Sequence, residues 1–278
     1  MPDRPVVLYS GQANHVPELK VASKGSRIND RKSVGTGSDT DVIIVHSSDL
    51  HVDDEYTARL HGGDGTRGLR CVLATARAAA ADVVVLAGDL FEHNRLPSRV
   101  LDRAARLLGD AAMEEVILPG NHDPAIPESA YHCGRVCDPA NVTVLGVTHD
   151  EAVVLPELRL EIWGHAHRDY DDMAPLGKPR RRSTSWQIAM AHGHYDPKPD
   201  MATALRPSWL ISDGEIAATG ADYVALGHWN RSVRVGNGAV AAYYSGSPEL
   251  ARTVNVVRLT AAGTVRVRRR KIQWDPPS

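Results

Sequence analysis

A series of short apolar runs, each followed closely by Asp, Asn or His, constrains the fold of this chain most strongly. The runs are largely aliphatic or β-branched and are bounded by Gly, Asn or Asp, which is typical of buried β-strands. We therefore predict strands at residues 41–45, 83–86, 116–118, 188–190 and 223–226.

The segments that separate the first three predicted strands have helical character, at residues 68–81 and 98–108. A helix between two consecutive strands predicts right-handed β-α-β crossovers, an α/β fold and a mostly parallel sheet. Loops at the carboxyl ends of the strands line the binding crevice of such sheets. Side chains far apart in the sequence are therefore expected to meet at one sheet edge.

The polar residues after these runs carry carboxylate, imidazole and carboxamide groups, a combination that suits divalent manganese, iron or zinc. In a two-metal site, one carboxylate bridges ions about 3.5 to 4 Å apart. We predict that Asp89 is this bridge and is essential for catalysis. The other predicted ligands are Asp49 and His51 for the first ion, and Asn121, His192 and His228 for the second.

His122 lies beside a predicted ligand but is not needed as one. Because imidazole titrates near neutral pH, we predict a catalytic role in which His122 protonates the leaving oxygen or stabilises charge in the transition state. Taken singly, each motif is more often a turn or a hydrogen-bonding cap. Their common order and their places after strands favour a metal centre.

These motifs resemble those of the calcineurin-like metallophosphoesterases over about residues 41–272: Asp-x-His, Gly-Asp, Gly-Asn-His-Asp, a His after a strand, and Gly-His. The resemblance implies two packed mixed β-sheets flanked by helices and a metal-dependent phosphoesterase. Residues 88–95 and 245–249 look most like the SbcD-type DNA repair exonucleases, which degrade DNA with two manganese ions. The implied reaction is in-line attack on a DNA phosphodiester by a hydroxide that two metals activate, with His122 contacting the scissile phosphate.

The last motif departs from the family pattern, because it reads Gly227-His-Trp-Asn230 where a second His usually binds the first metal. A carboxamide can coordinate manganese or magnesium but is a weaker donor than imidazole for zinc, so Asn230 is expected to hold the first ion loosely. A catalytically impaired metal-binding scaffold is therefore one alternative function. Gly164-His-Ala-His167 matches the missing motif literally but precedes His192, so we expect His165 and His167 to be loop residues near the cleft.

The charge balance does not separate DNA from smaller substrates. With 32 basic and 34 acidic side chains, the formal charge is -2, so DNA binding would depend on local positive charge. The basic stretch 180–182 is either a contact for polyanionic substrate beside the cleft or a solvated loop. Residues 265–271 predict an edge strand whose arginines face water. A small-molecule or nucleotide phosphodiesterase or phosphatase remains the alternative, because its core motifs would be the same.

Length and composition set the remaining expectations. The 278 residues, 42% hydrophobic and 24% charged, fit one catalytic domain at residues 41–274, and the polar residues 1–40 predict a flexible arm. The sequence lacks an apolar stretch of about 20 residues and an N-terminal signal core, and it has an odd number of cysteines. We therefore expect a cytoplasmic protein without membrane contact. Because the chain ends soon after the last predicted strand, we expect no SbcC-type ATPase partner.

Overall fold

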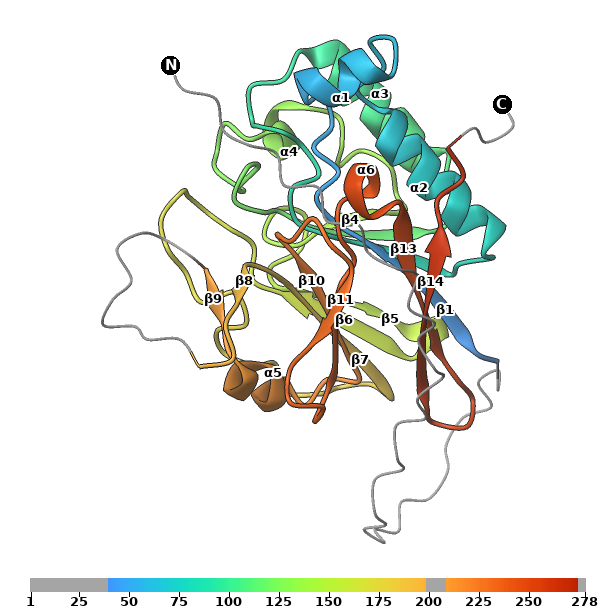
Figure 1. Ribbon diagram of the computed structural model, residues 1–278, viewed down its shortest axis with the longest axis vertical. Coiled ribbons are helices and arrows are strands. Elements are labelled where there is room, and N and C mark those ends of the chain that lie inside the picture. Colours follow the sequence, from blue (N-terminus) through green and yellow to red (C-terminus); the bar gives the residue numbers. More distant parts are fainter. Residues whose placement is uncertain (1–39, 199–208, 275–278) are drawn as a thin grey trace, which may run out of the picture. The chain divides into compact units, whose positions relative to one another are not determined.

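The computed structural model describes residues 40–198 and 209–274, all of which belong to one compact unit of the chain. Two six-stranded sheets and one two-stranded sheet form the β-structure of this part, with helices beside the sheets (Figure 1). The arrangement confirms the predicted fold class of two packed mixed sheets flanked by helices. The predicted flexible arm, residues 1–40, lies outside the described residues except for Thr40.

The first sheet combines a parallel centre with an antiparallel edge. Its order is β14 (Val265–Lys271), β13 (Thr253–Leu259), β1 (Val42–Ser47), β2 (Val83–Ala87), β3 (Glu114–Leu118) and β4 (Val142–Val144). Strands β1 to β4 pair in parallel, whereas β13 is antiparallel to both β1 and β14. The predicted parallel sheet is therefore correct for β1 to β3, and the added strands make the sheet mixed.

The second sheet has a parallel centre and two antiparallel edges. Its order is β11 (Val233–Val235), β12 (Ala241–Tyr244), β10 (Tyr223–Gly227), β7 (Trp186–His192), β6 (Leu160–Gly164) and β5 (Ala152–Leu155). Strands β12, β10, β7 and β6 run parallel, and β5 and β11 are antiparallel to their neighbours. The small sheet pairs β8 (His194–Tyr195) with β9 (Leu210–Ile211).

Alternating side chains of the central strands build three hydrophobic cores. In β2, Val84 and Leu86 point to the outer face of the first sheet, while Val83 and Val85 point into the space between the sheets. Strands β7 and β10 alternate in the same way between this inner core and the outer face of the second sheet. Each central strand is thus buried on both faces, which explains its continuous apolar sequence.

Helices cover the outer faces of both sheets (Figure 1). On the first sheet, α2 (Arg67–Ala78) and α3 (Ser98–Gly109) confirm the two predicted helices. On the second, α5 (Asp213–Thr219) begins with a capping box formed by Ser212 and Glu215. The shorter helices are α1 (Glu55–Leu60), α4 (Ala130–Cys133), α6 (Pro248–Ala251) and the 3-10 helix η1 (Pro156–Leu158). Among the described helices, none combines the length and the apolarity that a membrane span requires.

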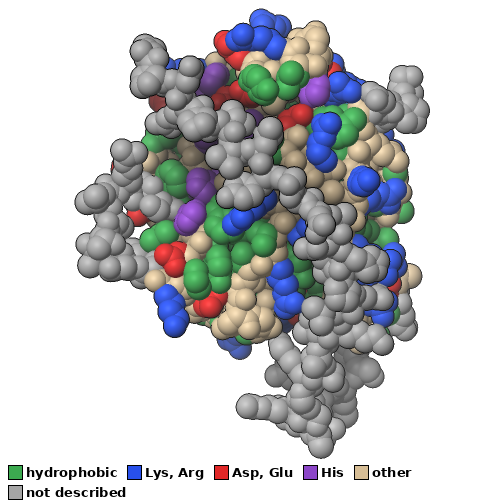
Figure 2. Space-filling model, in the orientation of Figure 1, with side chains coloured by type: hydrophobic (Ala, Val, Ile, Leu, Met, Phe, Trp, Pro, Cys, Tyr) green, Lys and Arg blue, Asp and Glu red, His purple; other side chains and the backbone are tan. Residues whose placement is uncertain are grey.

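The two basic segments of the sequence lie in different surroundings. Strand β14 is an edge strand with exposed arginines, as predicted, and Figure 2 shows Lys and Arg side chains along the side where β14 lies in Figure 1. Residues 180–182 precede β7 and so lie at its amino end, away from His192 at its carboxyl end. There Arg180 pairs with the buried Glu161 and Arg182 pairs with Asp222. This stretch therefore stabilises the second sheet and does not border the cleft.

Candidate metal centre

The predicted site residues gather at the carboxyl ends of strands from both sheets. Asp49 and His51 follow β1, Asp89 follows β2, Asn121 and His122 follow β3, His192 ends β7, and His228 follows β10. In the described residues, ligand-type atoms within 4.8 Å of one another form two clusters: His51, Asp89 and His122, and Asp89, His192 and His228. Asp89 belongs to both clusters, which is the position that a bridging carboxylate needs.

In the cluster of Asp89, His192 and His228, several ligand-type atoms converge. The Nε2 atom of His192 lies 3.1 Å from Asp89 Oδ2 and 3.0 Å from Asn121 Oδ1. The Nδ1 atom of His228 lies 3.2 Å from the same Asn121 oxygen. On the far side of its ring, His192 Nδ1–H donates to the carbonyl oxygen of Ala87 at 2.9 Å. This hydrogen bond turns Nε2 toward the cluster, as in metal-bound histidines.

The close approach of Asp89 and His192 governs their protonation. Burial alone would lower the pKa of His192, but the Asp89 carboxylate outweighs burial and the pKa rises to about 9. Burial would likewise raise the pKa of Asp89, yet attraction to His192 brings it below its ordinary value. The buried Asp89 carboxylate is therefore stabilised by a positive charge beside it. A divalent cation would supply that charge and leave the imidazole neutral.

In the cluster of His51, Asp89 and His122, Glu92 contacts both imidazoles. The Nδ1 atom of His51 lies 2.8 Å from Glu92 Oε2, and its Nε2 atom lies 4.0 Å from Asp89 Oδ2. A carboxylate on the far nitrogen is the usual support of a metal-bound histidine, so the placement of His51 fits a ligand. His122 Nδ1–H donates to the backbone carbonyl of Glu92 at 3.0 Å. His122 thus lies within the cluster, although the sequence interpretation did not make it a metal ligand. Its role as proton donor stays a prediction.

Asp49 joins the first loop of the site to the last. Its carboxylate accepts hydrogen bonds from Ser48 Oγ at 2.5 Å and from the backbone N–H of His228 at 3.0 Å. Burial raises the pKa of Asp49 to about 6, and a nearby cation would favour its ionised form. Asp49 belongs to neither three-residue cluster. Asp49 therefore lies beside the two clusters and not within either of them.

Four predicted ligands have backbone conformations that residues with side chains rarely adopt. The angle φ is 54° at Asp49, 45° at His51, 52° at Asp89 and 99° at His228. Such conformations cost about 1 to 3 kcal/mol each and concentrate at functional sites. Hydrogen bonds hold the first loop in place, because the backbone N–H groups of Asp49 and His51 donate to the carbonyl oxygens of Gly88 and Asp89. These four conformations mark this edge of the structure as a candidate functional site.

Two glycines of the motifs allow the loops to approach one another. A Cβ atom at Gly120 would lie 2.2 Å from Asp89 Oδ1, and a Cβ atom at Gly227 would lie 1.8 Å from the carbonyl oxygen of Ala87. Real carbon atoms do not come so close to oxygen. Glycine is thus required at both positions, and it brings Asn121 and His228 against the loop that carries Asp89.

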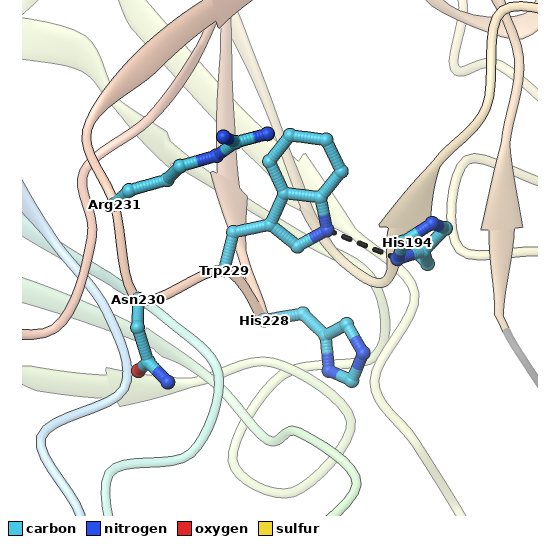
Figure 3. A pocket seen from close by; sticks show the side chains of 5 residues that line it. All are labelled: His194, His228, Trp229, Asn230 and Arg231. Atoms are coloured by element: carbon cyan, nitrogen blue, oxygen red, sulfur yellow. Dashed lines mark hydrogen bonds between the residues drawn. The ribbon is translucent and has the colours of Figure 1, made fainter. Parts of the chain in front are cut away.

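Asn230 stands apart from the two clusters. Its side chain is exposed and makes no hydrogen bond with the described residues. Together with His228, it lines an open cavity (Figure 3).

The alternative motif, Gly164-His-Ala-His167, supplies no ligand to either cluster. His165 lies 3.0 Å from a carboxylate oxygen of Glu151, and buried His167 packs on the His192 ring with Nε2 2.9 Å from the backbone oxygen of His192.

The sequence interpretation missed two residues that support the site, Glu92 and Asp123. Glu92 lies in an irregular loop, where its spacing from Asp89 gives no sign that it reaches His51. Asp123 is the last residue of Gly-Asn-His-Asp, and the motif alone does not reveal its partners. It accepts hydrogen bonds from the backbone N–H groups of Gly120 at 2.8 Å and Phe91 at 3.0 Å, and from the Tyr131 hydroxyl at 2.6 Å. These bonds fix two of the motif loops against each other.

The side chains present fit divalent metal ions. Asp49 and Asp89 are buried, and no Lys or Arg of the described residues pairs with either. Buried carboxylates without a Lys or Arg partner need positive charge from another source, which is a protonated imidazole or a metal ion. Asp89, Asn121, His192 and His228 would hold one ion; His51 and Asp89, with Asp49 nearby, would hold the other. Imidazole, carboxylate and carboxamide donors together suit manganese, iron or zinc.

Comparison with known proteins places this geometry in a family. A family model described as calcineurin-like phosphoesterase matches residues 43–232. The chain is 26% identical over 211 residues to the DNA double-strand break repair protein Mre11 of Aeropyrum pernix, covering 66% of this chain and 48% of that protein. It is 27% identical over 168 residues to the Mre11 protein of Archaeoglobus fulgidus, covering 58% and 37%. The chain thus spans about half, or less, of the length of these relatives.

Solved structures share the fold at lower identity. The crystal structure of TT1561 of Thermus thermophilus gives a TM-score of 0.51 at 15% identity, covering 83% of this chain and 99% of that one. A second crystal structure gives a TM-score of 0.50 at 14% identity, with 82% and 99% covered. The match to the family model extends over more than half of the chain and includes every predicted ligand from Asp49 to Asn230. The chain belongs to the calcineurin-like phosphoesterase family, a family of hydrolases that act on phosphate esters.

Proposed function

We propose that this protein is a metal-dependent phosphodiesterase that cleaves DNA and uses two divalent ions, with manganese as the preferred metal. The observation that carries this proposal is the membership of Asp89 in both clusters. A carboxylate shared by two sets of imidazoles is what a two-metal centre requires. Two relatives named for DNA double-strand break repair support DNA as the substrate.

We assign different tasks in the reaction to different side chains of the site. Bound ions would supply an activated water and neutralise charge on the phosphate. His51 and His192 each present one ring nitrogen to the centre. The other nitrogen of His192 donates to the Ala87 carbonyl, and the Glu92 carboxylate lies 2.8 Å from the other nitrogen of His51. His122, whose side chain is 41% exposed, can exchange protons with water and is the proposed donor to the leaving oxygen.

Hydrolysis of bis(para-nitrophenyl) phosphate in the presence of manganese tests the proposed activity. The native protein is expected to turn over this ester, and Asp89→Asn is expected to lose both bound manganese and activity, because the shared carboxylate is gone. Asp110→Asn, at the exposed C-cap of α3, is the matched control and should retain both. An Asp89→Asn variant with native activity would overturn the two-metal proposal.

A panel of DNA substrates tests the finer part of the proposal. Single-stranded and double-stranded oligodeoxynucleotides are incubated with the manganese-loaded protein, and products are separated by length. Cleavage of either supports a nuclease. Turnover of bis(para-nitrophenyl) phosphate without cleavage of any DNA would instead support a phosphodiesterase for small esters.

A metal-binding scaffold with little turnover is the second candidate, and Asn230 is the observation that favours it. The exposed carboxamide stands where the family motif has an imidazole. If this substitution limits the reaction, Asn230→His should increase both manganese affinity and the rate of ester hydrolysis. An Asn230→His variant with unchanged affinity and rate would remove the reason for the scaffold candidate.

A further inference from the structure

A cavity of about 490 Å³ lies beside the proposed metal centre, lined by His194, His228, Trp229, Asn230 and Arg231 (Figure 3). Its volume is in the usual range for small-ligand sites, about 300 to 1,000 Å³. His228 also belongs to the cluster of Asp89 and His192. A substrate whose phosphate lies at the metals can therefore extend into this cavity.

The lining of the cavity favours an anion. It contains one guanidinium group and two imidazoles but no carboxylate. Among the described residues, no acidic side chain pairs with Arg231, and its guanidinium makes no hydrogen bond. The planar guanidinium of arginine presents paired N–H donors that match the oxygens of a phosphate.

An aromatic stack holds Arg231 in position. The guanidinium carbon lies 4.9 Å from the ring centroid of Trp229, within the range of a cation–π contact. The Trp229 ring in turn stacks on Tyr244, with centroids 4.5 Å apart and planes within 9°. Its indole N–H donates to His194 Nδ1 at 3.1 Å, the dashed line in Figure 3. Because the guanidinium is already placed, less conformational freedom is lost when an anion binds.

The same stack makes Trp229 a poor platform for a nucleobase. Tyr244 stacks on the indole ring, and the Arg231 guanidinium carbon lies 4.9 Å from the indole centroid. These two contacts take up part of the ring surface on which a base would stack. Recognition in this cavity is therefore expected to depend on charge rather than on base identity.

Building on the proposed function, we propose that Arg231 binds a second phosphate of the substrate, the neighbour of the scissile one. The substrate class is then a DNA strand with successive phosphates, and an isolated phosphodiester makes only part of the contacts. Trp229 acts as a positioning residue that holds the guanidinium over the cavity. Because charge is recognised, base composition should have little effect on the rate.

Thymidine dinucleotides isolate the contribution of one additional phosphate. Three forms are compared with manganese: one with only the internal phosphodiester, one with a 5′-terminal phosphate and one with a 3′-terminal phosphate. For the native protein, one of the terminal phosphates is expected to raise kcat/KM by about ten-fold or more, mainly through KM, because hydrogen bonds to charged groups are strong. Which terminus gives the gain shows on which side of the scissile bond the cavity lies.

Variants at two arginines test whether Arg231 causes the increase in kcat/KM that a terminal phosphate gives. Arg231→Gln should lose most of this increase. Arg234→Gln is the matched control and should keep it, because Arg234 is also exposed and lies 6.0 Å over the Tyr243 ring but does not line the cavity. Trp229→Phe retains a ring and should keep much of the gain, whereas Trp229→Leu should lose it although Arg231 is present. If Trp229→Leu does not fold, the exposed Arg231 substitution decides the assignment alone.

The outcomes separate this proposal from the proposed function. An equal gain in the native protein and in Arg231→Gln, or no gain from either terminal phosphate, overturns the assignment of Arg231. Continued hydrolysis of bis(para-nitrophenyl) phosphate would then leave the phosphodiesterase proposal standing. No hydrolysis of any of these esters by the native protein would overturn both.

Discussion

His51 and His122 occupy one cluster but are held differently. His51 has the Glu92 carboxylate 2.8 Å from one ring nitrogen, an arrangement typical of histidines whose other nitrogen binds a metal. The His122 ring donates a hydrogen bond to the backbone carbonyl of Glu92, the Glu92 carboxylate lies 3.8 Å from the same ring nitrogen, and the side chain is 41% exposed. An exposed imidazole can take part in proton transfer. The two histidines therefore suit different tasks.

This difference predicts the behaviour of His122→Ala. The variant should keep its manganese while kcat falls by about 10²- to 10⁴-fold, the usual contribution of a general acid. Metal content by elemental analysis and turnover of bis(para-nitrophenyl) phosphate measure the two effects. His149→Ala, at an exposed histidine outside the centre, should change neither. Loss of manganese from His122→Ala would identify His122 as a ligand and contradict the proposed role.

The close packing at Gly120 gives a second prediction. In Gly120→Ala the new methyl group would lie 2.2 Å from Asp89 Oδ1, so the shared carboxylate must move. Manganese affinity should fall at least about ten-fold, by analogy with the loss of groups that orient metal ligands, as measured by titration calorimetry. Gly214→Ala is the control, because its nearest atom would be 3.8 Å away. Native affinity in Gly120→Ala would show that the carboxylate position is not critical.

Strand β3 contains an acidic residue that its neighbours do not neutralise. Glu115 is completely buried, and neither carboxylate oxygen has a hydrogen-bond partner among the described residues. Burial raises its pKa to about 9 from 4.5. The folded protein therefore keeps Glu115 protonated where the unfolded chain ionises it. The stability that depends on this proton is complete below pH 4.5 and is lost as the pH rises toward 9.

Glu115→Met should remove this part of the pH dependence. Between pH 5 and pH 9, the free energy of unfolding of the native protein should fall relative to that of the variant, by at most about 1.4 kcal/mol per pH unit. Urea unfolding at several pH values measures both curves. Glu114→Met, at the exposed neighbouring position of the same strand, is the control and should follow the native slope. Parallel curves for the native protein and Glu115→Met would show that Glu115 is ionised in the fold.

The sequence was most informative where a strand or helix is decided by its own residues. The β-branched runs that form β1, β2, β3, β7 and β10 and the apolar periodicity of α2 and α3 identify these elements directly. The antiparallel addition of β13 and β14 depends on contacts between distant segments. Motif spacing at strand ends indicated which side chains would meet. It could not show the contact of Glu92 with His51, because that contact depends on the path of an irregular loop.

Both sheets contribute to the metal centre, and a buried polar contact also joins them. His46 of β1 lies with Nδ1 2.8 Å from the hydroxyl oxygen of Tyr223 in β10, and burial lowers the pKa of His46 to about 3. The proposed ligands come from loops after β1, β2 and β3 in one sheet and from β7 and β10 in the other. A metal ion bound by these side chains would therefore link the two sheets.

This linkage predicts that manganese stabilises the fold. Only the folded chain brings the ligands together, so free manganese at about 100 times its Kd should add about 2.7 kcal/mol to the free energy of unfolding. Tm should rise with manganese and fall after treatment with a chelator, as measured by circular dichroism. Asp89→Asn should show little of this shift, whereas Asp110→Asn should show all of it. A native Tm independent of manganese would contradict the linkage.

The spread of the ligands along the chain affects when the protein can acquire its ions during biosynthesis. Asp49 and His228 are 179 positions apart, and the strands that carry them lie in different sheets. A ribosome must therefore release nearly all of the domain before a complete ligand set exists, because domains generally fold as units. Metal loading would then follow the folding of this domain, and the folded domain would compete for whatever metal the cell has free at that time.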